Sequence, residues 1–154
     1  MKIRSFLLIV LLGVSFSCSS DEYGDVDAFV HGFYQSFSAQ DIGRISRDFF
    51  HPNAQAVFGE HVSPLANEED VRQLFSAILA SLAKKQYRRS VIKSMVKTPL
   101  GSHFVFVTVL FDREKADGSK IDSMCSSYSV LKTNQGWRFL QWVPSDPLPG
   151  GRCS

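Results

Sequence analysis

The sequence holds little that would mark a metal site, a nucleic-acid surface or a membrane span. Its 3 cysteines and 4 histidines are scattered and match no zinc-ligand spacing, so we expect no metal and no cofactor. The one long apolar run, residues 6–14, is shorter than the roughly 20 residues that cross a bilayer. No Gly-x-Ser-x-Gly motif marks a nucleophilic serine, and no basic stripe interleaved with aromatic residues indicates a nucleic-acid partner. Fold class and destination are therefore what the sequence predicts best.

What is present suffices for one folded domain. Of the 154 residues, 44% are hydrophobic and 13 are phenylalanine, while the formal net charge is only +2. A chain of this length and composition can bury a core and is not disordered.

The first residues have the pattern of a secretory signal. Lys2 and Arg4 precede the apolar run, and small residues follow it up to Cys18, which predicts a signal peptide over 1–17. Cys18 followed by two serines resembles the bacterial lipoprotein cleavage box, in which the cysteine carries the lipid. Ordinary signal peptidase cleavage at the same small residues is the alternative. We favour the lipoprotein, which implies an exported protein of the periplasm or outer membrane, attached to the membrane through Cys18.

Two cysteines remain after Cys18. In an oxidising compartment Cys125 and Cys153 could pair and fasten the Gly/Pro-rich tail 144–154 to the domain. The alternative, which the sequence slightly favours, is a buried Cys125 on a strand and an unpaired Cys153 in the tail.

Charge is divided between the two halves of the chain. Residues 18–72 hold 10 acidic and 3 basic residues, whereas 73–154 hold 5 acidic and 12 basic residues. We expect the halves to complement each other within one domain. One basic cluster stands out around Tyr87, made of Lys84, Lys85, Arg88, Arg89, Lys93 and Lys97. It fits anionic lipid headgroups or an acidic partner, or, as we prefer, a solvated helix end that leads into an edge strand protected by charge.

Hydrophobic periodicity predicts helices first and strands afterwards. Apolar residues at helical spacing predict a helix over 26–39, and a second helix after Asp41 that carries Phe49 and Phe50 and ends at His51-Pro52. A short strand over 54–58, a loop over 59–66 and a third helix capped by Asn67 follow. The period then changes to 2, which predicts four long strands at 87–97, 103–112, 121–132 and 137–143. This order indicates an α+β fold, with helices on one face of an antiparallel sheet curved into a cone around a cavity.

Several segments resemble the nuclear transport factor 2-like superfamily, especially its SnoaL-like and ketosteroid-isomerase-like bacterial members. The resemblance covers residues 25–143, after a tether over 18–24, and rests on Phe33-Tyr34, Phe50-His51-Pro52-Asn53-Ala54, Phe104–Phe111, Ser127–Leu131 and Gly136-Trp137-Arg138-Phe139. It implies a cystatin-like roll, with three N-terminal helices packed on the concave face of the sheet, and a homodimer formed through the open sheet face.

The resemblance also allows a test for ketosteroid-isomerase chemistry. That chemistry needs a carboxylate base, together with a tyrosine and a protonated aspartate that donate to the oxyanion. Counting along the family pattern places Phe33, beside Tyr34, at the tyrosine, Phe58 near the base and Tyr128 at the aspartate. Because the base is missing, we expect no ketosteroid-isomerase activity and identify no catalytic residue.

The functional prediction is therefore a domain that binds a small apolar ligand or acts as an interaction module. The alternative is a SnoaL-like lyase, isomerase or hydrolase that uses polar groups in the cavity. The candidate pocket residues are Tyr34, Phe58, His61, Asp122, Ser126 and Tyr128.

Overall fold

The structure is a computed structural model and describes residues 23–153. The predicted signal peptide, Cys18 and the predicted tether as far as residue 22 lie outside the described residues. Among residues 23–153, no helix is long and apolar enough to cross a membrane.

Each of the three helices has an end that is closed by hydrogen bonds, from the backbone in α1 and to a side chain in α2 and α3. Helix α1 spans Gly24–Ser38 and ends in a Schellman turn, in which Gln40 N donates to Phe37 O and Asp41 N to Ser36 O. Helix α2 spans Ile42–Asp48, and the Asp41 carboxylate caps it by accepting from Arg44 N at 2.9 Å. Helix α3 spans Glu68–Ala83 and has the predicted Asn67 cap, whose Oδ1 accepts from two backbone N–H groups.

Six strands form one sheet in the order β2-β1-β6-β5-β4-β3. The strands are β1 Phe50–Phe58, β2 His61–Leu65, β3 Tyr87–Pro99, β4 Phe104–Lys115, β5 Lys120–Thr133 and β6 Gly136–Ser145. The four long strands β3 to β6 are antiparallel neighbours, as the hairpin turns predict. Strand β1 adds a parallel pair with β6, so the complete sheet is mixed.

Two element predictions before α3 were wrong. Phe50 begins β1 instead of ending α2, and residues 61–65 form strand β2 instead of a loop. In both places proline misled the prediction. Pro52 lies where the register between β1 and β6 shifts, and Pro64 lies on the edge strand β2, and proline is tolerated at both kinds of position.

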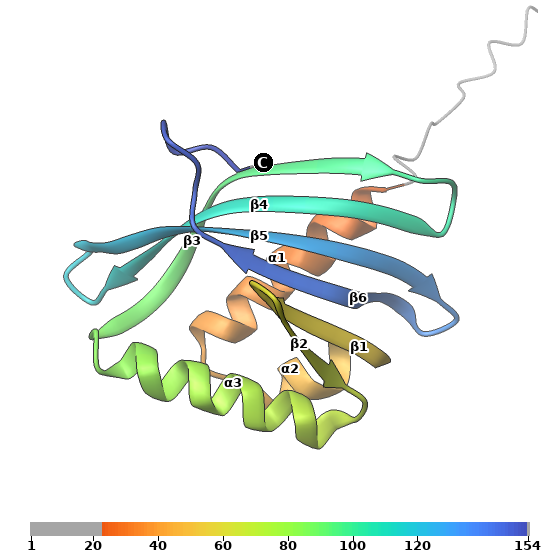
Figure 1. The fold of residues 1–154 in the computed structure, drawn as a ribbon, viewed down its shortest axis with the longest axis horizontal. Coiled ribbons are helices and arrows are strands. Elements are labelled where there is room, and N and C mark those ends of the chain that lie inside the picture. Colours follow the sequence, from red (N-terminus) through yellow and green to blue (C-terminus); the bar gives the residue numbers. More distant parts are fainter. Residues whose placement is uncertain (1–22, 154) are drawn as a thin grey trace, which may run out of the picture.

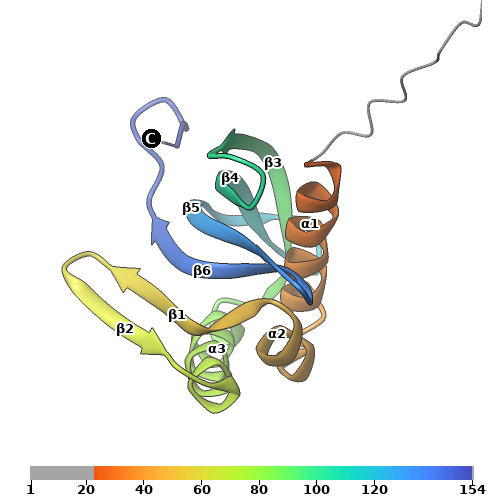
Figure 2. The ribbon, with the colours of Figure 1, turned by 90° about the vertical axis from the view of Figure 1, so that its right-hand side faces the viewer.

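The helices and the concave face of the sheet enclose the core (Figures 1 and 2). Phe33, Phe75, Tyr128 and Phe139 meet in its centre as a cluster of aromatic rings. This arrangement is the α+β, cystatin-like roll that the resemblance implies.

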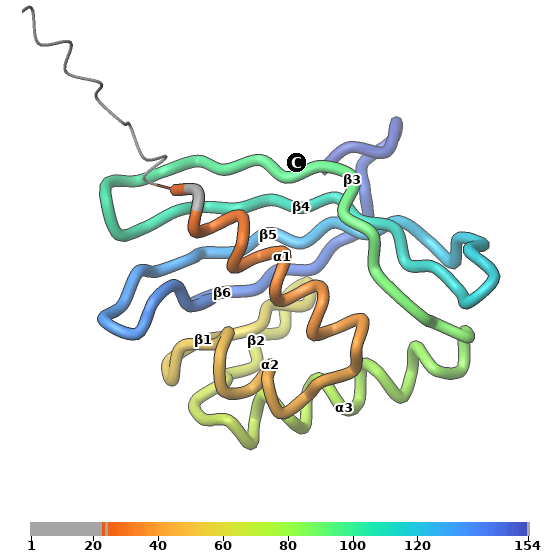
Figure 3. Tube along the Cα trace, turned by 180° about the vertical axis from the view of Figure 1, so that it is seen from behind, coloured from red at the N-terminus to blue at the C-terminus, as the bar shows by residue number. Residues whose placement is uncertain are grey.

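Helix α1 is bound to strand β3 near both of its ends. Ser38 Oγ accepts from Ser90 N at 3.0 Å, and Asp27 pairs with Lys97 at 2.8 Å. From behind, α1 is seen to run diagonally from the β3–β4 hairpin towards α3 (Figure 3). The Asp27–Lys97 pair is the only ion pair among residues 23–153 that joins the acidic half of the chain to the basic half. The expected complementarity of the halves is therefore confined to one contact.

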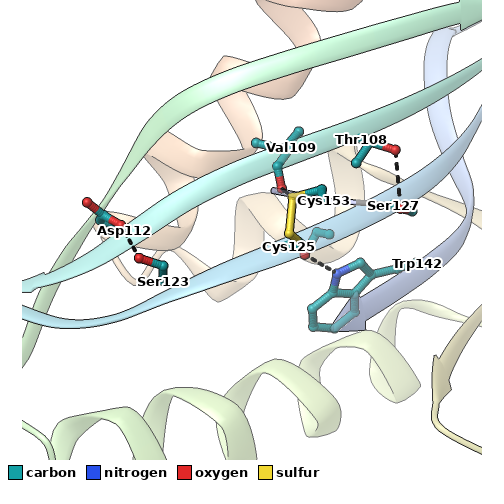
Figure 4. Close-up of a disulfide and its surroundings, with 9 residues drawn as sticks. Thr108, Val109, Asp112, Ser123, Cys125, Ser127, Trp142 and Cys153 are labelled. Atoms are coloured by element: carbon teal, nitrogen blue, oxygen red, sulfur yellow. Dashed lines mark hydrogen bonds between the residues drawn. A yellow bond between two sulfur atoms is a disulfide. The ribbon is translucent and has the colours of Figure 1, made fainter. Parts of the chain in front are cut away.

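The C-terminal tail folds back onto the sheet and is held there by a disulfide. Cys125 of β5 is bonded to Cys153, with the two Cα atoms 5.6 Å apart (Figure 4). A bridge between Leu148 and Arg152 closes the turn in the tail. The unpaired arrangement that the sequence slightly favoured is wrong, because the tail reverses direction, which its two glycines at positive φ, Gly150 and Gly151, permit.

Candidate functional site

Two of the predicted pocket residues form a hydrogen-bonded pair in the core. Tyr34 of α1 and Tyr128 of β5 lie with their hydroxyl oxygens 3.0 Å apart. Tyr128 is 1% exposed and stacks on Phe139, while Phe111 meets the edge of Tyr34. The sequence therefore identified two groups that meet, although they are 94 residues apart.

Burial fixes the protonation state of this tyrosine pair. Burial raises the pKa of Tyr34 well above its ordinary value, and the neighbouring Tyr128 raises it further. Burial likewise raises the pKa of Tyr128, against the opposing effect of hydrogen bonds from Tyr34 and Ser126. Both phenols are thus neutral near pH 7 and can donate a proton in a hydrogen bond, but neither is a base.

A pocket of about 390 Å³ opens beside this pair, between the helices and the sheet. Aromatic and aliphatic side chains from α1, α3 and four strands supply most of its walls: Phe37, Phe58, Ile78, Phe111, Met124 and Trp142. The remaining lining residues are Gly59, Arg113, Ser126, Pro144, Ser145 and Asp146. A volume of this size suits a small molecule, and the walls favour an apolar one.

The buried polar group of the pocket is already engaged. Ser126 is 1% exposed, and its Oγ accepts from Trp142 Nε1 at 3.0 Å. Figure 4 shows the Trp142 indole turned towards strand β5. This bond orients the indole ring, which also stacks on Phe75 and meets the edge of Phe58.

An ion cluster lies at the rim of the pocket. Arg113, which lines the pocket, makes two hydrogen bonds to the carboxylate of Asp122, at 2.5 and 2.6 Å. Lys85 approaches the same carboxylate at 3.7 Å. The Asp122 carboxylate is therefore held by two cations.

The six predicted pocket residues separate into three groups. Phe58 and Ser126 line the pocket. Tyr34 and Tyr128 lie behind its wall, and Asp122 lies at its rim. His61 does not line the pocket, because residues 61–65 form an edge strand on which His61 is exposed.

Sequence reasoning missed the contribution of strand β4. Phe111 and Arg113 continue the alternation of Val105, Val107 and Val109, which are buried in the core. Counting by twos along this strand from Val109 would have found them. Within residues 23–153, no group of three or more histidine, cysteine, aspartate or glutamate side chains is arranged to hold a metal ion.

Comparison with known proteins agrees with this architecture. A family model described as "NTF2-like protein (DUF6841)" matches residues 21–147. The chain belongs to this NTF2-like family. A comparison with curated proteins gives no match.

Solved structures share the NTF2-like fold at low sequence identity. Aln2 from a Streptomyces species superposes with a TM-score of 0.66 at 15% identity, over 83% of this chain and 92% of that chain. An NTF2-like protein with a cystatin-like fold from Novosphingobium aromaticivorans gives 0.64 at 10% identity, over 85% and 86%. A domain with a cystatin-like fold from Nostoc punctiforme gives 0.66 at 12% identity, over 84% and 80%. At these identities the likeness shows the fold alone.

Proposed function

We propose that this NTF2-like protein binds a small apolar ligand in the pocket between α1, α3 and the concave face of the sheet. The observation that carries the proposal is the combination of apolar walls with polar groups that are bonded to one another, apart from Ser145 and Asp146, which line the pocket but are exposed to solvent. Ser126 is bonded to Trp142, Arg113 to Asp122 and Tyr34 to Tyr128. A ligand gains most there by burying apolar surface, at roughly 25 cal/mol per Å².

The proposal includes the destination expected from the N-terminal sequence. The protein is exported and attached to the membrane through lipidated Cys18. Mass spectrometry of the mature protein tests this part independently, because lipidation would add the mass of acyl chains to a chain that begins at residue 18.

A second candidate function is SnoaL-like catalysis, and one observation favours it. Counting along the ketosteroid-isomerase pattern places Tyr128 at the position of the oxyanion-binding aspartate, and Tyr34 next to the position of the oxyanion-binding tyrosine. In the structure the hydroxyl groups of Tyr34 and Tyr128 are hydrogen-bonded to each other. Two neutral phenols can stabilise a developing oxyanion. If the pair is catalytic, Tyr128→Phe abolishes turnover of the ligand; if the protein only binds, the variant keeps its affinity and there is no turnover to lose.

The interaction part of the proposal is a homodimer through the outer face of the sheet. Val96 is 63% exposed and Phe106 is 45% exposed on this face, which supports burial against a second copy. Sedimentation analysis tests it: Phe106→Asp dissociates such a dimer, whereas Val62→Asp, an exposed apolar residue on β2, leaves it intact.

The ligand itself is tested by native mass spectrometry of the protein purified from its own host. We expect an added mass that is lost on denaturation. Ile78→Trp fills the pocket and should abolish the added mass, whereas Leu74→Trp, also half-buried on α3 but outside the pocket, should retain it.

A further inference from the structure

Cationic side chains gather at one end of the molecule, where α3 leads into β3 and the β4–β5 turn lies alongside. We call this the basic end and define it by Lys84, Lys85, Arg88, Arg89, Lys93 and Lys115. Between residues 84 and 122 the chain has 9 basic and 4 acidic residues. Like charges held together repel one another, so the cluster needs a physical explanation.

Protection of the free edge of β3 accounts for cations on that strand, but not for Lys115 at the end of β4. Part of this edge is also covered, because the backbone N–H of Ser90 donates to Ser38 Oγ of α1. The end of α3 accounts for Lys84, its C-cap residue, and for Lys85, but not for the cations on β3 and β4.

Ion pairing within the protein leaves much of this charge unbalanced. Arg89 pairs with Glu114 at 2.8 Å and Lys85 with Asp122 at 3.7 Å. Within residues 23–153, Arg88 and Lys115 make no ion pair, and the same holds for Lys84 and Lys93.

Three of these cations converge on one hollow of about 610 Å³. Arg88 and Arg89 line it from β3, and Lys115 lines it from the end of β4. The register between β3 and β4 shifts between Tyr87 and Arg89, so Arg88 is the extra residue of a bulge, a feature that re-aims a side chain. The rest of the lining is the β4–β5 turn, Ala116, Asp117 and Gly118, and the end of α1, Ser38 and Ala39.

The one acid among these lining residues is turned to its own loop. Asp117 Oδ1 accepts from both the backbone N and the Oγ of Ser119. Glu114 occupies Nε and Nη2 of Arg89, which leaves the other terminal nitrogen, Nη1, available. The hollow therefore presents two guanidinium groups and one ammonium group beside one carboxylate, and these three cationic groups are donors that match phosphate oxygens.

We propose that this hollow binds a phosphate-bearing anion, either free phosphate or the headgroup of an anionic lipid. Arg88 and Lys115, which make no ion pair within residues 23–153, are two of the donors, and Arg89 is held in place by Glu114 as a third. The site lies outside the apolar pocket and shares no lining residue with it, so the proposal stands independently of the ligand proposed above.

The test compares two double variants that remove the same charge from the full chain. Arg88→Gln/Lys115→Gln removes two groups that line the hollow, and Lys84→Gln/Lys93→Gln removes two cations of the basic end that do not. Calorimetric titration with inorganic phosphate should show saturable binding that weakens at least about tenfold in the first variant, because two charge-assisted hydrogen bonds are lost. The second variant should change it by no more than about threefold, the screened effect of distant surface charge.

Vesicles distinguish the two sources of the phosphate group. Phosphatidylcholine vesicles with and without phosphatidylglycerol are tested for co-sedimentation. Binding that requires phosphatidylglycerol and Arg88 with Lys115 supports a headgroup site, and binding of phosphate alone supports a free-phosphate site. Equal weakening in both double variants, or no binding of either probe by the wild-type protein, overturns the proposal. Ile78→Trp should leave phosphate binding unchanged.

Discussion

The two ends of the concave face of β5 hold different kinds of polar side chain. Tyr128 and Asp122 lie six residues apart on the concave side of β5, and Met124 and Ser126 between them line the pocket. At the deep end Tyr128 is neutral and bonded to another neutral phenol. At the rim, Asp122 has 29% of its side chain exposed and is bonded to two cations. Solvent access therefore decides whether an end of this strand face can hold charged groups or only neutral ones. The apolar pocket lies between the two ends.

The largest loss of stability is expected when an aromatic ring is removed from the deep end of the core. Phe33→Ala should lower the free energy of unfolding by about 3–5 kcal/mol, because Phe33 is 3% exposed and packs against Phe49, Phe75 and Phe139. Phe58→Ala at the pocket mouth should cost about 1 kcal/mol or less, since that ring is 36% exposed. Urea unfolding of both variants measures the difference, and equal losses would contradict the distinction between deep end and rim.

Removing the disulfide tests how much the attached C-terminal tail contributes to the stability of the domain. Cys125→Ser/Cys153→Ser should lower stability by about 3 kcal/mol, because the bond closes a loop across a sequence separation of 28 residues. The wild-type protein in reductant is the control and should unfold at the same urea concentration as the double variant. A double variant as stable as the oxidised protein would show that the tail contributes nothing.

Stability at high pH tests whether the two tyrosines at the deep end are buried. The folded pKa of Tyr34 and of Tyr128 is raised above the ordinary value of 10.0, so the folded state keeps protons that the unfolded state releases. Below pH 10 both states keep these protons, and the free energy of unfolding does not depend on them. As the pH rises from 10 towards the folded pKa, the free energy of unfolding falls by about 1.4 kcal/mol per pH unit for each tyrosine. Urea midpoints measured above pH 10 should fall less steeply for Tyr34→Phe/Tyr128→Phe than for wild type. Identical slopes would mean that the pair is not buried.

A double-mutant cycle measures the tyrosine pair directly at neutral pH. Tyr34→Phe and Tyr128→Phe should each cost about 1–2 kcal/mol, because each leaves one buried hydroxyl without its partner. The double variant should cost clearly less than the sum of the two. Additive losses would show that the hydroxyls do not interact.

The smallest effect is expected at the rim. Asp122→Asn should cost about 1 kcal/mol or less, because the ion cluster is partly solvated. The loss should shrink further in high salt, which screens the wild-type pairs. A loss as large as that of the tyrosine variants, insensitive to salt, would place Asp122 in a dry environment.

The elements predicted well were those with long, unbroken patterns. The Asn67 cap with three acids behind it and the alternation of β4 each specify one structure. Phe49 and Phe50 were harder, because two adjacent buried aromatics suit the end of a helix and the start of a strand equally well. The parallel pairing of β1 with β6 is non-local and leaves no signal in either segment.

The site was predictable as far as side chains alternate along one strand. The sequence named Tyr34, Tyr128 and Ser126 as candidate pocket residues; in the structure Ser126 lines the pocket and the two tyrosines lie behind its wall. His61 was predicted in a loop over the pocket, whereas the turn at Gly59 makes a hairpin in which His61 pairs with Phe58 and is exposed without lining the pocket. The pairing of Asp122 with Arg113 joins two strands, and no local pattern predicts which cation a carboxylate meets.

Native mass spectrometry of the host-purified protein, with Ile78→Trp and Leu74→Trp beside it, tests the ligand-binding proposal most directly. The account predicts a bound mass on the wild-type and Leu74→Trp proteins that is lost on denaturation and absent from Ile78→Trp. A wild-type protein that carries no added mass, or a mass that Ile78→Trp retains, would contradict the assignment of this pocket as the binding site.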